Sequence, residues 1–334
     1  MPIRFFFSKQ LSLFHVVVLL LGLSAAIFFI VRNQFESKIG GAEHEVSSNS
    51  KLNTLRNTHY KFTRPLIAFD LNNESESLYP IKEQLNTIIQ QSKTSGNLFE
   101  ASVYLRDLET GEFISINNEM RYHPGSLIKV PMLMYYLHES ETNPAILNKT
   151  LSLTGDGRMP SQTFKGQQIE FDKPYTIREL LKYMAAYSDN RATTLLNMYC
   201  DIPKFKNVFS ELGLPQPNVT DTNFSMTVRD YSVFMRVLFN ATYLNPSNSD
   251  LALTLLSESS FRDGIVSKLP ADVLVARKFG ETFKDQKREL HESGIIYCNN
   301  KPYMLIVMTK GYNPQQLAGF ISNISDTIYH FFCV

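Results

Sequence analysis

The chain has 334 residues, of which 43% are hydrophobic and 19% are charged, so it can bury a substantial core and is not disordered as a whole. Its formal net charge is +1, and this balance argues against an electrostatic nucleic-acid binder, which would carry a basic surface. The length suits one large domain, or one domain with a subdomain inserted into it.

The N-terminal segment is predicted to meet a membrane. Residues 10–31 carry no charge and are mostly apolar, and about 20 such residues in a helix span a bilayer core. The apolar run continues past a weak small-residue cleavage site at Ser24, so we favour an uncleaved signal anchor over a cleaved signal peptide for residues 1–32. Residues 33–62 are polar and are predicted to form a stalk.

Residues 63–334 are predicted to form the folded domain. A helix is expected to open at Pro80, and a hairpin is expected over 99–116. The next helix is expected to begin near Ser126, with Pro131 in its first turns, where a missing N–H costs least.

Helices then fill the middle of the domain, and strands return near its end. This order suggests one mixed sheet with a helical subdomain. The expected helices are 176–188, 191–199, 203–212, 227–240, 250–258 and 314–332, and the expected strands are 273–280, 294–300 and 303–311, with a tight turn at Asn299-Asn300.

Ser126 and Lys129 form the first of three short motifs that carry candidate chemistry. Residues three apart share a helix face, and a desolvated neutral lysine can take the proton of a serine nucleophile. The motif says little alone, because Ser48 and Lys51 in the predicted stalk repeat it.

Ser188-Asp189-Asn190 is the second motif and ends an amphipathic helix. Its serine is a candidate proton relay, and its asparagine is a candidate ligand for a substrate amide. By itself such a tripeptide is more often a helix end or cap.

The third motif is Lys278-Phe279-Gly280, at the end of an apolar strand. Gly280 would let a ligand approach the strand edge closely. The backbone N–H of the next residue, Glu281, would pair with that of Ser126 as an oxyanion hole.

The order and spacing of the three motifs give them meaning together. The second motif begins 62 residues after Ser126, and the third begins 90 residues after Ser188. Over residues 65–334 the chain resembles the class A β-lactamases and related penicillin-binding proteins, with their Ser-x-x-Lys, Ser-Asp-Asn and Lys-Thr-Gly signature. The resemblance implies an α/β (α+β) fold: a five-stranded antiparallel sheet with flanking helices plus an all-helical subdomain.

The resemblance also implies a mechanism without metal or cofactor. Ser126 attacks an acyl carbon, Lys129 takes its proton, and Ser188 passes a proton to the leaving nitrogen. Asn190 holds the substrate's side-chain amide, and Lys278 offers positive charge to a substrate carboxylate. The expected partner is a small β-lactam or a peptidoglycan peptide, acted on by a monomer outside the cytoplasm, tethered in the cell envelope.

Three functions from different classes stay open on the sequence. The first is a serine β-lactamase acting on β-lactam amide bonds. The second is a D,D-peptidase or peptidoglycan acyl-transferase that penicillins inhibit. The third is a non-catalytic cell-envelope binding protein, which the intact motifs argue against.

The chain departs from the family pattern at Phe279, where the family has Thr or Ser. If this side chain faces the substrate, a carboxylate-binding hydroxyl is lost, and Arg288 or His291, placed between the last two strands, would supply the contact. A histidine without any ligand is an equal reading of His291.

A second departure concerns deacylation. Class A β-lactamases carry a Glu in an omega loop, but residues 213–226 contain none. Asp221, followed by Asn223, is the acid of that segment and fits a turn or cap better than a base. Without a positioned base, the acyl-enzyme is expected to persist.

The cysteines Cys200, Cys298 and Cys333 cannot all pair within one chain, and no two have metal-ligand spacing. We expect free thiols, buried or near the terminus.

Overall fold

The structure is a computed structural model that describes residues 52–56, 66–71, 73–155, 162–217, 224–284, 286–298 and 301–334. The predicted anchor, most of the predicted stalk, Asp221, Asn223 and the turn at 299–300 lie outside these residues. In the described part of the chain, no helix is both long and apolar enough to cross a bilayer.

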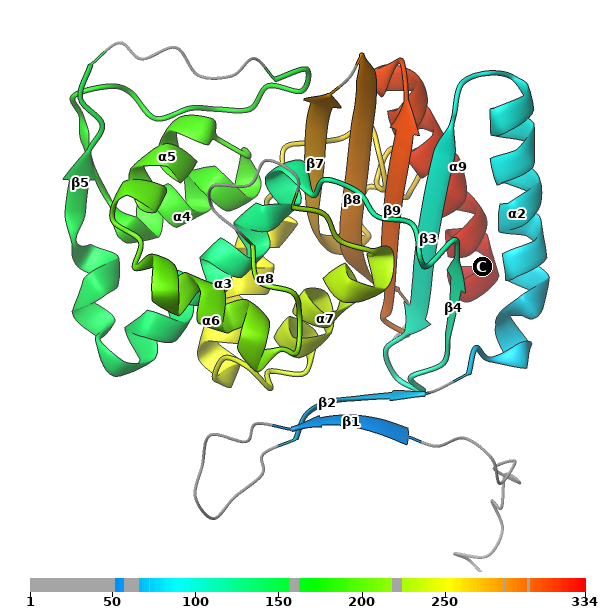
Figure 1. Cartoon of the computed structure of the whole chain (residues 1–334), viewed down its shortest axis with the longest axis horizontal. Coiled ribbons are helices and arrows are strands. Elements are labelled where there is room, and N and C mark those ends of the chain that lie inside the picture. The colour runs from blue at the N-terminus through cyan, green and yellow to red at the C-terminus, as the bar shows by residue number, and fades with distance from the viewer. Residues whose placement is uncertain are drawn as a thin grey trace, which may run out of the picture. The chain divides into compact units, whose positions relative to one another are not determined.

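A five-stranded sheet forms the frame of the domain (Figure 1). Its order is β4-β3-β9-β8-β7, and each neighbouring pair is antiparallel. The implied five-stranded antiparallel sheet is therefore confirmed, and it combines strands from both ends of the domain as the strand pattern suggested. The strands are β3 Glu100–Asp107, β4 Phe113–Ile116, β7 Leu274–Lys284, β8 Lys287–Tyr297 and β9 Tyr303–Gly311.

Strand β8 begins seven residues before its predicted start at Gly294. Its first half contains Glu289, His291 and Glu292, which are charged or polar and yet buried. A polar run of this kind lacks the apolar alternation from which strands are predicted. The strand forms because β7 and β9 pair with it on both sides.

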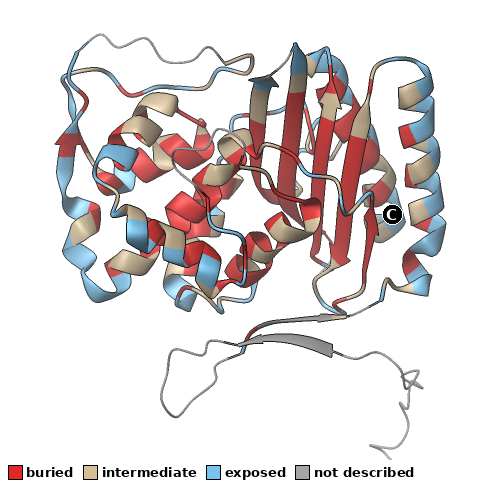
Figure 2. Ribbon diagram, viewed as in Figure 1, coloured by how far each residue is buried: buried red, intermediate tan, exposed pale blue. Residues whose placement is uncertain are grey.

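Helices α2 (Tyr79–Thr94) and α9 (Pro314–Cys333) cover one face of the sheet. Their apolar residues pack with those of the strands in one cluster that includes Ile81, Leu85 and Ile321. Figure 2 shows the buried residues concentrated in the sheet and along the inner faces of these helices.

The remaining helices form the all-helical part and pack against a second buried cluster beside the sheet. Capping boxes fix two helix starts, at Thr176 with Glu179 and at Thr227 with Asp230. The elements are α3 Lys129–Thr142, α4 Ile177–Ala186, α5 Asn190–Met198, α6 Ile202–Glu211, α7 Val228–Phe239 and α8 Pro246–Ser257, with short pairs β1 Leu52–Arg56 with β2 Leu66–Leu71 and β5 Thr150–Ser152 with β6 Pro174–Thr176, and 3-10 turns η1 Glu76–Leu78, η2 Gly125–Ile128 and η3 Pro144–Asn148.

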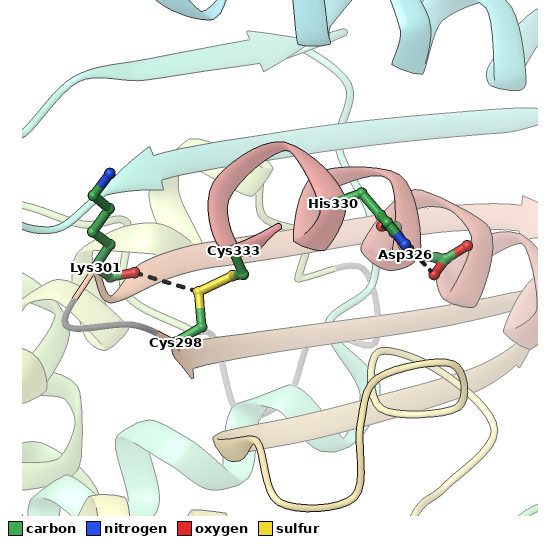
Figure 3. The surroundings of a disulfide bond; sticks show 5 residues. All are labelled: Cys298, Lys301, Asp326, His330 and Cys333. Atoms are coloured by element: carbon green, nitrogen blue, oxygen red, sulfur yellow. Dashed lines mark hydrogen bonds and ion pairs between the residues drawn. A yellow bond between two sulfur atoms is a disulfide. The ribbon is translucent and has the colours of Figure 1, made fainter.

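Cys298 and Cys333 form a disulfide, which corrects the expectation of free thiols for these two residues (Figure 3). The bond joins the chain just after β8 to the last residue of α9, with Cα atoms 5.9 Å apart. The sequence did not reveal the pair, because three cysteines allow several pairings. Cys200 is the free thiol of the three.

We expect Cys298→Ser to lower the free energy of unfolding by about 2–4 kcal/mol, because the bond closes a loop across 35 positions and restricts the unfolded chain. Urea unfolding with and without a thiol reductant measures this. The reductant should destabilise the wild type and leave the variant unchanged. A wild type insensitive to reductant would contradict the bond's contribution.

Candidate active site

Ser126 lies in the 3-10 turn η2, and α3 begins directly after it at Lys129. The predicted single helix is therefore a 3-10 turn that continues into an α-helix. Ser126 is partly exposed, whereas Lys129 is 3% exposed. The two residues are thus one helical turn apart, at the boundary between the sheet and the helices.

Two glycines allow β7 to lie against this turn. Gly125 has φ +52°, and a Cβ there would lie 2.6 Å from the carbonyl oxygen of Glu281. A Cβ on Gly280 would lie 2.5 Å from the carbonyl oxygen of Pro124 and 2.8 Å from the backbone nitrogen of Leu127. The backbones of the first and third motifs therefore meet, and any side chain at position 280 would separate them.

The Lys129 ammonium is bonded to the second motif. Its Nζ donates to the carbonyl oxygen of Ser188 at 2.6 Å, to Ser188 Oγ at 3.2 Å and to Asn190 Oδ1 at 2.9 Å. Burial lowers the pKa of Lys129 to about 7, although the charges of Asp189 and Glu281 act to raise it. A lysine in this state can exchange a proton near neutral pH.

A tight, buried turn presents the second motif. Ser188 is 0% exposed and has φ +54°, a region that L-residues rarely occupy. Asp189 caps α5, since its Oδ1 accepts from the backbone N–H of Arg191 at 2.8 Å and its Oδ2 accepts from that of Ile169 at 2.8 Å. Asn190 follows as the first residue of α5.

Lys278 lies in β7 and is 1% exposed. Its Nζ donates to the carbonyl oxygen of Phe279 at 2.9 Å. Burial, followed by the charge of Lys129, lowers the pKa of Lys278 well below its usual value. The structure therefore brings the first, second and third motifs together, with two lysines close enough to influence each other.

The Phe279 ring belongs to an aromatic cluster. It is 2% exposed and lies with its centroid 4.4 Å from that of Phe261 and 6.2 Å from that of Phe164. The Lys278 ammonium is 4.5 Å from the ring centroid. Phe279 is therefore packed in the interior of the protein and contributes no hydroxyl to the site.

His291 cannot supply the carboxylate contact considered above, because it is 0% exposed and both ring nitrogens are occupied. The backbone N–H of Thr309 donates to its Nδ1 at 3.2 Å, so its Nε2 carries the proton and donates to the carbonyl oxygen of His123 at 3.0 Å. Both His291 and Arg288 lie within β8, and not between strands as predicted.

Glu289 holds the chain that leads to Ser126, and sequence reasoning missed it. Its Oε2 accepts from the backbone N–H of His123 at 2.8 Å, and its Oε1 lies 3.5 Å from the Lys310 ammonium. Burial acts to raise the pKa of Glu289, but hydrogen bonds from His291 and His123 and the charge of Lys310 outweigh it and lower the pKa to about 2. The polar sequence around Glu289 gives no indication of this contact, because its partner is 166 positions away in the chain.

A cavity of about 550 Å³ opens beside η2, between this turn and the end of β7. Its lining is mainly apolar and includes the ring of the partly buried Phe224. The lining residues are His123, Pro124, Gly125, Ile128, Phe224, Thr282 and Phe283.

An antiparallel five-stranded sheet with an all-helical part beside it is the fold of β-lactamases and penicillin-binding transpeptidases. The model of the beta-lactamase enzyme family matches residues 80–332, and the chain belongs to that family.

Three proteins similar to the chain are each 22% identical to it or less. A β-lactamase of Bacteroides uniformis is 22% identical over 245 residues, which cover 66% of this chain and 82% of the relative. A β-lactamase structure from Chitinophaga pinensis is 18% identical, with a TM-score of 0.65 over 75% of this chain and 99% of that one. The structure of PBP-A is also 18% identical, with a TM-score of 0.63 over 76% and 96%. A mutant of PBP-A is known as an acyl-enzyme complex with penicillin G.

Proposed function

We propose that the protein is a serine hydrolase that forms an acyl-enzyme on Ser126 and acts on β-lactam amide bonds. One observation carries the proposal: the Lys129 ammonium is buried one turn after Ser126 and hydrogen-bonded to Ser188 and Asn190. Burial lowers the pKa of Lys129 to about 7, so a neutral amine is available to take the serine proton at neutral pH.

The other motif residues have roles that fit their positions. Ser188 Oγ, 3.2 Å from Lys129 Nζ, relays the proton to the leaving nitrogen. The backbone N–H groups of Ser126 and Glu281 hold the oxyanion, and Gly280 lets the two segments approach. Asn190 binds the substrate amide through its side-chain NH₂, since its Oδ1 faces Lys129.

The cavity beside η2 suits the acyl side chain of the substrate. It borders Gly125, the residue before the nucleophile, and its apolar lining favours an apolar or aromatic substituent. Lys278 does not line this cavity and is 1% exposed, which limits direct contact between its ammonium and a substrate carboxylate.

A second candidate is a D,D-peptidase that penicillins acylate and inhibit. It is favoured by the sequence of residues 213–226, which contains no Glu to activate a deacylating water. Both candidates share acylation of Ser126 and differ in the lifetime of the acyl-enzyme.

We also propose that the domain works outside the cytoplasm, tethered by residues 1–32. Two observations support this location. The Cys298–Cys333 disulfide is of the kind that persists in oxidising compartments, and the N-terminal apolar run is long enough for an anchor.

Intact mass spectrometry of residues 51–334, mixed with a penicillin, tests the proposal. We expect an adduct on Ser126 and none on Ser126→Ala. Rapid loss of the adduct with release of product marks a β-lactamase, and a long-lived adduct marks a penicillin-binding peptidase. No adduct at any concentration would refute both candidates.

A further inference from the structure

A short strap, residues 162–166, joins the two sides of the site. The side-chain NH₂ of Gln162 donates to the carbonyl oxygen of Ser188 at 3.0 Å. On the other side, the backbone N–H of Thr163 donates to Glu281 Oε1 at 2.9 Å. The described end of the loop between β5 and β6 thus reaches β7, as Figure 1 shows. Glu281 is the β7 residue that holds it.

The strap also packs on the aromatic cluster that includes Phe279, whose ring centroid lies 4.5 Å from the Lys278 ammonium. The ring of Phe164 packs edge-on against Phe261 at 4.8 Å and against Phe279 at 6.2 Å between centroids. A Cβ on Gly166 would lie 2.5 Å from the carbonyl oxygen of Tyr187, so the strap lies directly on the chain before Ser188. The Lys278 residue is 1% exposed, and its ammonium donates a hydrogen bond to a protein carbonyl, that of Phe279.

Glu281 is an acidic residue of β7 that lies next to the nucleophile's turn. The residue is partly exposed, and its backbone carbonyl packs against Gly125, the residue before the nucleophile. Its charge acts to raise the pKa of both Lys129 and Lys278, so it lies within electrostatic reach of both ammonium groups. The protein therefore supplies its own carboxylate on the side of the site where a substrate carboxylate would approach Lys278.

We propose that Glu281 is a specificity-determining residue, whose side-chain carboxylate disfavours acyl donors that carry a carboxylate next to the scissile amide and favours donors that are neutral there. This rests on the proposed acylation of Ser126. A second carboxylate at short range meets like-charge repulsion and finds the Lys278 ammonium already covered. The favoured substrate class is thus an amide that carries no carboxylate on its leaving-group side.

Glu281→Gln separates charge from structure. Glutamine keeps an oxygen that can accept the Thr163 N–H, so the strap stays in place while the negative charge is lost. Glu83→Gln is the matched control, because it removes the same charge from an exposed position of α2, on the covered face of the sheet.

The experiment compares benzylpenicillin with its neutral methyl ester. The second-order rate of Ser126 acylation is measured for each compound and divided by the rate of its spontaneous hydrolysis, which removes intrinsic reactivity. The wild type and Glu83→Gln should prefer the ester. Glu281→Gln should raise the acid-to-ester ratio at least about tenfold, because at an effective dielectric constant of about 20 two like charges as far as ~12 Å apart already repel by that factor.

Two results would overturn the inference while the proposed function stands: a wild type that prefers the acid, or a Glu281→Gln ratio within twofold of the wild type although both compounds acylate Ser126. Circular dichroism shows that the variant is folded. If neither compound acylates the wild type, the proposed function itself fails.

Discussion

Lys129→Ala should slow acylation of Ser126 by penicillin about 10²- to 10⁴-fold, the usual contribution of a positioned general base. The lysine is the buried amine one turn after the serine, and it holds the Ser188 hydroxyl at 3.2 Å. Its removal takes away the proton acceptor and frees the relay. The measurement is the second-order rate of adduct formation by intact mass.

The pH dependence of wild-type acylation tests the same role of Lys129. The neutral amine is the active form, and burial lowers the pKa of Lys129 to about 7. The rate should therefore rise about tenfold per pH unit below 7 and level off above it.

The matched control for Lys129→Ala is Lys268→Ala, an exposed lysine bonded to Asn323 at 2.7 Å. This control should acylate like the wild type. Equal labelling by Lys129→Ala and the wild type would remove Lys129 from the mechanism.

The fold was predictable where local pattern and pairing agree. The expected helix starts at Pro80 and Thr176 each lie one residue from the observed starts of α2 at Tyr79 and of α4 at Ile177. The first half of β8 escaped prediction because Glu289 and Glu292 are buried by tertiary contacts that leave no local pattern.

The candidate site was likewise predictable only in part. Order and spacing along the chain pointed to Ser126, Lys129 and Ser188, because a family signature is a property of sequence. The Glu281 side chain escaped notice, because its partner Thr163 is 118 positions away and lies in a loop. The sequence predicted a role for the backbone N–H of Glu281. The contact between its carboxylate and the backbone N–H of Thr163 is visible only in the folded structure.

A buried ion pair behind the third motif carries the second large prediction. Arg277 Nε lies 3.3 Å from Glu292 Oε1, and these side chains are 3% and 0% exposed. Arg277 also donates to the carbonyl oxygen of Ser259 at 2.8 Å, and Glu292 Oε2 accepts from the backbone N–H of Ile265 at 2.7 Å. The pair therefore fastens the segment before β7 to β8. A Cβ on Gly264 would overlap Glu292 Oε2, so any side chain there would have to displace this buried carboxylate.

We expect Glu292→Ala to lower the free energy of unfolding by about 3–5 kcal/mol, because it leaves the Arg277 charge buried without its partner. Replacing both residues at once with apolar side chains, Arg277→Met with Glu292→Leu, removes the unpaired charge and should cost much less than the single change. Urea unfolding of the wild type, Arg277→Met, Glu292→Leu and the double variant measures the coupling, and Glu292→Ala is measured beside them.

Arg277 directly precedes Lys278 in β7, so a change at Arg277 could affect acylation as well as stability. The double replacement separates these two effects. If the pair acts by fastening the segment before β7, a double variant that regains stability should also regain acylation of Ser126. A single Glu292→Ala change costing under about 1 kcal/mol would show that water or rearrangement already satisfies Arg277, because an unpaired buried charge cannot be so cheap.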